Sequence, residues 1–357
     1  MLRQMLYKLF IKGGGLFLIA LVIVTAAISV FSGISKAKLK NENDLNLYRA
    51  LISEYCGEYT EEKGAAIDRL SEEKQSVFDK IDALNERYAK ENLSYEEYKA
   101  DRLALNDLLA GSDGYMLFCN RVSAAENNGV PIFDDTVWSV LFSKGITELI
   151  VVAAVIAAAV ILVLRDLELP VKLLFGTTKY GIKKIYLLNA AYIFVFSMLL
   201  GIVISIVKLA AAHLSYGVEY GAFPLNGLSL FEGSEYQLSL LGGYWLFSIL
   251  HSFGLAFFGG SILFAGILLR NTLYMAALSF LSVIVPSLFE SSKWLLFVPA
   301  PFHLVYAARL FSGIYNDIGE KTYLSMSSIL WFIFASGILC VCFYTAFVLI
   351  GIRREKV

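Results

Sequence analysis

Few side chains in this sequence could do chemistry within an apolar environment. Glu148, Lys208 and His251 fall inside or beside long apolar stretches. Ionisable groups within a bilayer mark ion or proton paths when they pair with one another. Glu148 and Lys208 lie near the ends of their stretches, so we expect Lys208 to extend toward the lipid–water interface. The sequence therefore gives little support to proton or sodium coupling.

Motifs for metal binding and catalysis are not found. The cysteines do not have the paired spacing of a zinc site; they are Cys56, Cys119, Cys340 and Cys342. The histidines stand apart without an HExxH pattern, which favours packing or interfacial roles; they are His213, His251 and His303. The stretch 176–183 resembles a phosphate-binding loop but has Ile182 where the lysine belongs. We expect no metal, no cofactor and no enzyme activity.

The composition favours a membrane protein. Of 357 residues, 57% are hydrophobic and 17% are charged, and the mean hydropathy is +0.64. The net charge of −1 gives no basic excess for binding nucleic acid. Residues 36–137 carry 13 basic and 21 acidic side chains, so 34 of the 61 charges lie in this stretch. It is predicted to be a water-soluble insert in an otherwise membrane-embedded chain.

Six apolar stretches are long enough to cross a hydrocarbon core of ~30 Å as helices. They cover residues 14–33, 146–164, 185–209, 240–268, 272–289 and 329–351, of which the fifth is the shortest. The predicted fold class is an all-α membrane protein. Residues 1–13 place apolar side chains on one face and basic ones on the other, which predicts an amphipathic helix at the membrane interface. The alternative for residues 1–13 is a frayed basic leader.

The distribution of Lys and Arg predicts the orientation. With the N-terminus inside, the inner segments hold twelve basic and three acidic residues. Positively charged loops stay in the cytoplasm. The loop 210–239, which would then lie outside, has no Lys or Arg. We therefore expect a multi-pass protein of the plasma membrane with both termini in the cytoplasm.

The segment 34–145 is predicted to be an extracellular helical insert. Apolar residues between Thr60 and Asn92 repeat at heptad-like spacing. Thr60 is a suitable N-cap, and Ser94 with Glu97 forms a capping-box sequence, so an outward helical hairpin is expected. The hairpin could serve as a spacer, capture a ligand, contact a partner protein or dock against a second copy. An antiparallel hairpin could also bring Cys56 and Cys119 together as a disulfide.

Small residues recur at every fourth position of the fourth apolar stretch. They are Ser248, Ser252, Ala256 and Gly260. Such a face lets another helix approach closely, either within the chain or at a subunit interface.

The loop 165–184 resembles the first cytoplasmic loop of ABC transporter type 2 permeases, the membrane subunits of many bacterial exporters. The matching residues are Glu168, Leu173, Leu174, Gly176, Thr177, Thr178, Lys179, Gly181, Lys183 and Lys184. Pro170 and Ile182 depart from the family pattern. The order of one span, a large outer insert and five further spans also resembles one branch of that family, including permeases of Gram-positive bacteria.

The resemblance implies a permease that forms the translocation path as a dimer of identical or different chains. A separate ATPase subunit would bind the loop 165–184 and the N-terminal helix. The apolar side chains of the loop suit a short helix that docks in a groove of a soluble partner. The alternative is a solvated basic loop in which Thr177 and Thr178 cap a helix.

Residues 294–315 are apolar but interrupted by Pro299, Pro301, His303 and Arg309. A full span here would reverse the basic C-terminus, so a pair of re-entrant helices is expected. In the resembled family such helices roof the outer end of the path. The predicted function is the permease subunit of an ATP-driven exporter with an undetermined substrate. The alternative is a membrane-anchored sensor or scaffold whose insert binds a ligand or a partner.

Overall fold

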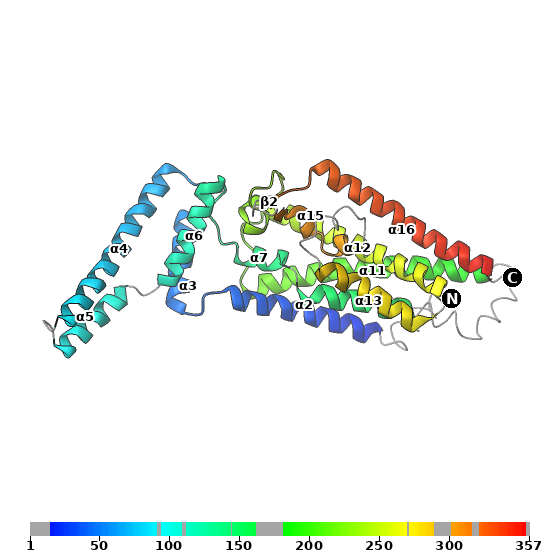
Figure 1. The fold of residues 1–357 in the computed structure, drawn as a ribbon, viewed down its shortest axis with the longest axis horizontal. Helices are drawn as coiled ribbons and strands as arrows, with labels where there is room; N and C mark the ends of the chain where they lie inside the picture. Colours follow the sequence, from blue (N-terminus) through cyan, green and yellow to red (C-terminus); the bar gives the residue numbers. More distant parts are fainter. Residues whose placement is uncertain are drawn as a thin grey trace.

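The computed structural model describes residues 15–90, 94–108, 112–143, 145–161, 181–269, 271–288, 301–315 and 321–354. Within these ranges the chain forms a bundle of long helices, and a separate group of helices extends from one end of it (Figure 1). The predicted interfacial helix at 1–13 and the loop residues 165–180 lie outside the described residues. So do residues 294–300 of the predicted re-entrant segment.

All six apolar stretches are helical wherever they are described. The helices are α2 (Gly15–Ala37), α8 (Ile146–Ala159), α11 (Gly181–Ser215), α12 (Leu240–Leu269), α13 (Thr272–Leu288) and α16 (Met326–Arg354). Among the described residues, five segments are long and apolar enough to cross a membrane. The helix α13 has 17 residues, and its apolar stretch Leu273–Ser282 is shorter than a span. The fold is that of an all-α membrane protein.

The second apolar segment is longer than predicted and is broken. A short helix, α7 (Thr136–Phe142), precedes α8, and the two together make the candidate span Thr136–Ala159. The side chains of α7 are mostly buried, including that of Trp138. The predicted span starts at Ile146, and the polar residues around Ser143 separate it from the apolar residues of α7.

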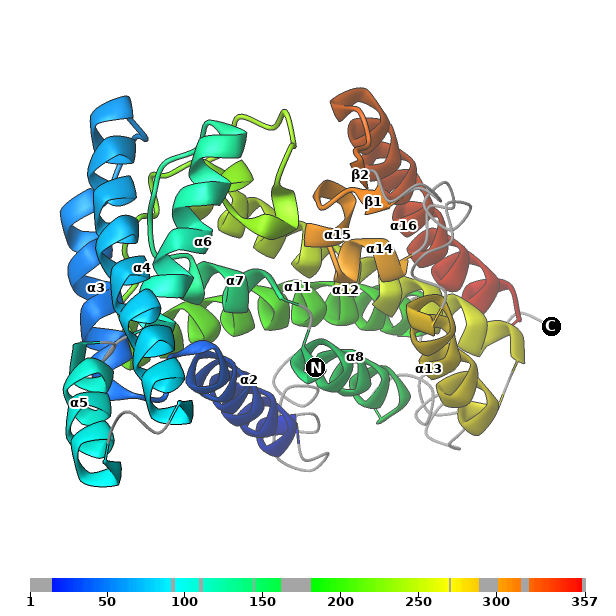
Figure 2. The same cartoon turned by 60° about the vertical axis from the view of Figure 1, so that its left-hand side comes forward.

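The helix α12 lies at the centre of the bundle, between α11 and α16 and beside α8 (Figure 2). Close approach to these neighbours depends on small residues. A Cβ atom at Gly201 of α11 would lie 2.7 Å from the Cα of Ser252, and one at Gly260 would lie 2.7 Å from the ring of Tyr344 on α16. The α12 helix therefore uses its small residues for packing within this chain.

The helices α11 and α16 carry large, exposed apolar side chains on the faces that point away from α12, and α2 and α13 also carry such side chains. Exposed examples are Phe17, Leu199, Leu273, Trp331 and Val341. Such a surface is favourable in lipid and unfavourable in water.

Between α2 and α7, the described part of the insert contains four helices, two more than the predicted hairpin. They are α3 (Glu42–Tyr55), α4 (Glu61–Ala89), α5 (Tyr95–Leu108) and α6 (Ser112–Asn128). The helices α3 and α6 pack together next to the bundle, and the α4–α5 pair extends beyond them (Figure 1). The predicted starts of α4 and α5 are both confirmed. The Thr60 hydroxyl accepts a hydrogen bond from the Lys63 backbone N–H at 3.3 Å, and Ser94 and Glu97 cap each other reciprocally.

The insert is joined to the bundle by polar contacts centred on Asp134. Its carboxylate accepts hydrogen bonds from the hydroxyls of Tyr48 on α3 at 3.3 Å and of Tyr216 after α11 at 2.8 Å. It also accepts the backbone N–H of Thr136 at the start of α7, at 3.0 Å. A second contact nearby is the ion pair of Arg121 on α6 with Asp135. Burial raises the pKa of Asp135 in spite of this partner.

We expect Asp134→Ala to loosen this joint. Three hydrogen bonds are lost, and each contributes roughly 0.5–1.5 kcal/mol, with more for a charged acceptor. Hydrogen exchange of the α3 and α6 amides should become faster, while exchange in α12 should stay unchanged. The control is Asp82→Ala on the exposed face of α4, which removes the same charge from the insert. Equal exchange in the two variants would mean that Asp134 does not hold the joint.

A cap of short elements covers the insert-proximal end of the bundle. It consists of η3 (Leu225–Gly227), η4 (Ser229–Phe231), α14 (Pro301–Val305), α15 (Ala308–Phe311) and a hairpin of β1 (Ile314–Tyr315) with β2 (Lys321–Thr322). The strands are antiparallel with Ile314 opposite Thr322. The Lys321 ammonium ties the hairpin to η4 by donating to the carbonyls of Ser229 at 3.0 Å and Leu230 at 2.7 Å.

Candidate functional site

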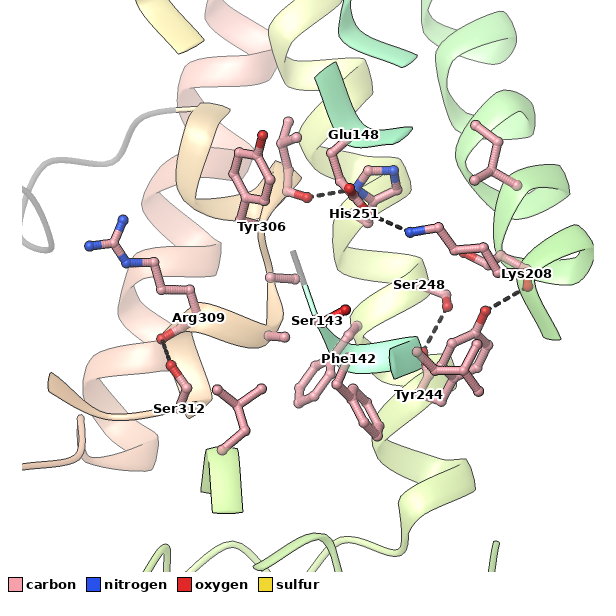
Figure 3. Close-up of a pocket in the computed structure, with 18 of the residues that line it drawn as sticks. Phe142, Ser143, Glu148, Lys208, Tyr244, Ser248, His251, Tyr306, Arg309 and Ser312 are labelled. Atoms are coloured by element: carbon pink, nitrogen blue, oxygen red, sulfur yellow. Dashed lines mark hydrogen bonds and ion pairs between the residues drawn. The ribbon is translucent and has the colours of Figure 1, made fainter. Parts of the chain in front are cut away.

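A cavity of about 450 Å³ lies beneath this cap, between α7, α8, α11, α12 and the α14–α15 segment (Figure 3). Its apolar wall is built from aromatic rings. The Phe142 and Phe247 rings meet nearly edge-on, with their centroids 5.6 Å apart. The centroids of the Phe247 and Phe311 rings are 4.7 Å apart. Leu141, Ile204 and Leu230 complete this wall. A second, polar wall contains the three ionisable residues singled out in the sequence, Glu148, Lys208 and His251.

The break between α7 and α8 opens onto the cavity. The hydroxyl of Ser143 donates to the carbonyl of Val140 at 2.8 Å, so this carbonyl in the last turn of α7 has a hydrogen-bond partner. At the start of α8, the Glu148 carboxylate accepts the backbone N–H of Gly145 at 2.9 Å. A helix break inside an apolar bundle is tolerated where its polar backbone groups find such partners.

The Glu148 carboxylate forms an ion pair with the ammonium of Lys208. The two side chains come from α8 and α11 and are only 11% and 14% exposed. The expectation that Lys208 extends to the interface is therefore wrong. The carboxylate holds the ammonium inside the bundle, because a buried charge needs a partner of opposite sign. The two residues are 60 positions apart, so no local pattern could have predicted the pair.

His251 from α12 completes the polar wall. Its Nδ1 atom lies 2.6 Å from the carbonyl oxygen of Val305, at the end of α14. A carbonyl can only accept, so Nδ1 carries the proton and Nε2 has a free lone pair when the ring is neutral. The other histidines lie elsewhere. His303 is fully buried against the Phe332 ring, and His213 is exposed near the end of α11.

Besides Ser143, four residues on the cavity wall donate their hydroxyl protons to backbone carbonyls. Ser205 donates to Gly201, Ser248 to Tyr244 and Tyr244 to Ser205, at 3.0, 2.7 and 2.6 Å. Ser312 donates to Arg309 at 3.2 Å. The oxygen atoms of these hydroxyls keep unused lone pairs, so the wall offers hydrogen-bond acceptors.

The four residues of the predicted small face are buried inside the chain. Ser248 lines the cavity, and Ser252 contacts Gly201. The Ala256 carbonyl accepts from the Tyr344 hydroxyl at 2.9 Å, and Gly260 contacts the Tyr344 ring. The face thus contacts α11 and α16 of the same chain, which is the first of the two possibilities left by the sequence.

Only the end of the predicted ATPase-coupling loop is described. Gly181 begins α11, and Lys183 and Lys184 in its first turn are exposed. The coupling residues Glu168, Leu173, Leu174, Gly176, Thr177, Thr178 and Lys179 lie outside the described residues. The start of α11 lies at the end of the bundle opposite the insert (Figure 1).

Cys56 and Cys119 of the insert are half-buried free thiols and are not joined. Cys56 ends α3, and Cys119 lies on α6. The described residues hold no group of three or more His, Cys, Asp or Glu side chains placed to bind a metal ion.

The cavity therefore combines a size suited to a small molecule with an aromatic wall and a polar wall. Its polar wall has a hydrogen-bond acceptor in His251 and an ion pair in Glu148 and Lys208. Comparison with protein-family models, with curated proteins and with solved structures finds no match to this chain.

Proposed function

We propose that this chain is the membrane-spanning permease subunit of an ATP-driven exporter, which works as a dimer with a separate ATPase subunit. The observation that carries the proposal is that the two ends of the bundle differ. One end has exposed basic residues, and the other has the cavity, its cap and the insert. This is the layout of a conduit that is driven from one side and releases its cargo on the other.

The basic end is assembled from three helices. The Arg354 guanidinium at the end of α16 donates to the carbonyl of Ile267 near the end of α12, and Gly351 contacts the Tyr186 ring in the first turns of α11. Lys183, Lys184, Arg353 and Arg354 therefore gather at one end. In the residues described at this end, 181–186, 267–269, 271–273 and 351–354, there is no Asp or Glu. Lys and Arg accumulate on the cytoplasmic side of membrane proteins.

The proposed topology follows from this polarity. Both termini are cytoplasmic, the insert is extracellular and the protein lies in the plasma membrane. The six spans are α2, α7–α8, α11, α12, α13 and α16. Of these, α13 is described as far as Leu288. In the described part of the 294–315 segment, α14 packs on α12, and Phe311 of α15 contacts the Phe247 ring of α12. This segment would be the re-entrant pair that roofs the transport path.

The partner subunit would dock at the basic end. In the resembled family the ATPase binds the loop that leads into the third span, which here is the segment 165–184. Its described end, with Lys183 and Lys184, is exposed and accessible to a soluble partner. The chain itself would then do no nucleotide chemistry, and closure of the ATPase would move the helices around the cavity.

The test is purification of the tagged chain from membranes of the cell that naturally makes it. We expect an ATP-binding subunit to co-purify. The charge-reversal variant Lys183→Glu/Lys184→Glu should reduce its recovery at least several-fold, because it reverses the charge of the docking surface. The matched control is Lys36→Glu/Lys38→Glu, which reverses two exposed charges at the other end of the bundle, where α2 ends.

An unchanged recovery in the Lys183→Glu/Lys184→Glu variant would contradict docking at this end. Absence of any ATP-binding subunit from the purified protein would favour the alternative of a sensor or scaffold that works through the insert.

A further inference from the structure

We propose that the cavity beneath the cap binds a small amphipathic molecule whose polar head is uncharged and donates hydrogen bonds, such as an alcohol or an amide. This inference deepens the proposed function by naming the class of cargo, and it rests on that function only for the statement that the ligand is transported. Binding itself depends on the cavity alone.

The size of the cavity and its aromatic wall favour a molecule with an apolar body. Ligand-binding cavities have volumes of roughly 300–1,000 Å³, and about 450 Å³ falls within this range. Phe142, Phe247 and Leu230 all line the cavity, and the Phe142 and Phe247 rings are in contact with each other. An alkyl or aromatic body would displace water from this surface with a gain in free energy.

The charges of the polar wall favour an uncharged head group. The Glu148 carboxylate is already paired with the Lys208 ammonium and with the Gly145 N–H. A charged ligand would introduce a charge without a partner, which is costly in an environment of low dielectric. Arg309 also contributes to the lining, but its guanidinium points away from the Glu148–Lys208 pair (Figure 3).

The hydrogen bonds of the polar wall favour a head group that donates. The hydroxyls of Ser205, Ser248, Tyr244 and Ser312 give their protons to backbone carbonyls and can only accept further bonds. The Nε2 atom of His251 has no hydrogen-bond partner among the described residues. With Nδ1 committed to Val305, this atom is an acceptor on a residue that lines the cavity. A hydroxyl or amide N–H of the ligand would satisfy it.

The test is photoaffinity labelling of the purified full chain in lipid nanodiscs. The probe is an eight-carbon primary alcohol with a diazirine near the end of its chain. We expect saturable labelling of the residues that line the cavity, identified by mass spectrometry of peptides. Competitors with the same chain length separate the head groups. Octanol and octanamide should compete. The methyl ether, the amine and the carboxylate should compete with an affinity at least roughly fivefold lower, since each lacks a donor or adds a charge.

Variants separate the cavity from the lipid-facing surface. Ser248→Phe fills the cavity and should abolish the saturable labelling. Ile249→Phe adds a ring at the next position of α12, which is exposed on the outer surface, and should leave it unchanged. His251→Phe removes the acceptor and should weaken binding roughly fivefold, while His251→Gln supplies an acceptor and should retain it. Each variant is compared only where its thermal midpoint shows that it is folded.

Labelling spread evenly over lipid-facing residues would overturn the proposal, and so would stronger competition by the amine or the carboxylate than by octanol. Either result leaves co-purification of an ATPase unaffected, so failure of this inference is distinguishable from failure of the proposed function. Conversely, saturable labelling of the cavity without an ATPase partner would retain the ligand site and reject the exporter.

Discussion

Replacing Lys208 by methionine should destabilise the protein by about 3–5 kcal/mol, because it leaves the Glu148 carboxylate buried without its ion partner. The only hydrogen bond to that carboxylate that the described structure then retains is from the Gly145 N–H. The carboxylate must take up a proton or remain as an unpaired charge, and both are costly. The measurement is unfolding of the protein in mixed micelles of increasing SDS content, followed by circular dichroism.

The double variant Glu148→Gln/Lys208→Met gives the decisive comparison. It removes both charges, and a neutral pair of similar volume often costs little. We expect the double variant to be more stable than Lys208→Met alone. Lys183→Met on the exposed start of the same helix is the control and should change stability by less than about 0.5 kcal/mol. If Lys208→Met unfolds at the same SDS fraction as the original protein, the ion pair is not buried.

Gly254→Ala should destabilise the contact between α12 and the cap by about 1–3 kcal/mol. A Cβ atom at this position would lie 2.5 Å from the carbonyl carbon of Leu304 and 2.6 Å from the Val305 nitrogen. Both neighbours are backbone atoms, so α14 as a whole must shift. The shift would also move the Val305 carbonyl that orients His251. Unfolding in SDS, together with labelling by the diazirine alcohol, measures the two effects.

The matched control is Gly337→Ala on α16. The nearest atom to its Cβ would be the Phe253 ring carbon at 4.0 Å, an ordinary contact. This change should leave stability equal or slightly higher, since alanine favours helix more than glycine does. Equal stability of Gly254→Ala and Gly337→Ala would show that α14 is not packed against Gly254.

Local features of the fold could be predicted from the sequence. The Thr60 cap and the Ser94–Glu97 capping box depend on residues three positions apart, and the structure confirms both. The long apolar helices follow from continuous runs of side chains. The break at Ser143 hid the helix α7, because a polar interruption in sequence reads as the end of a span. Its satisfied hydrogen bonds become visible only in three dimensions.

The candidate site could be predicted only in part. Glu148, Lys208 and His251 were recognisable as ionisable residues in apolar surroundings, but their assembly depends on the packing of three helices. The sequence places the charge of Lys208 at the interface, because its partner is 60 positions away and cannot be recognised locally. The small face of α12 was recognisable from its spacing, whereas its contacts with Gly201 and Tyr344 were not. Contacts between distant segments are specified by the whole core and carry no local pattern.

The proposed exporter depends on a separate ATPase that drives the chain from the basic end of the bundle. The most direct test places a photoreactive phenylalanine analogue at position 184, or at position 36 at the opposite end, in native membranes. A chain that also binds a radiolabelled photoactive ATP analogue should crosslink to position 184 and not to position 36. Crosslinking of that chain to position 36 alone, or to neither position, would contradict the account.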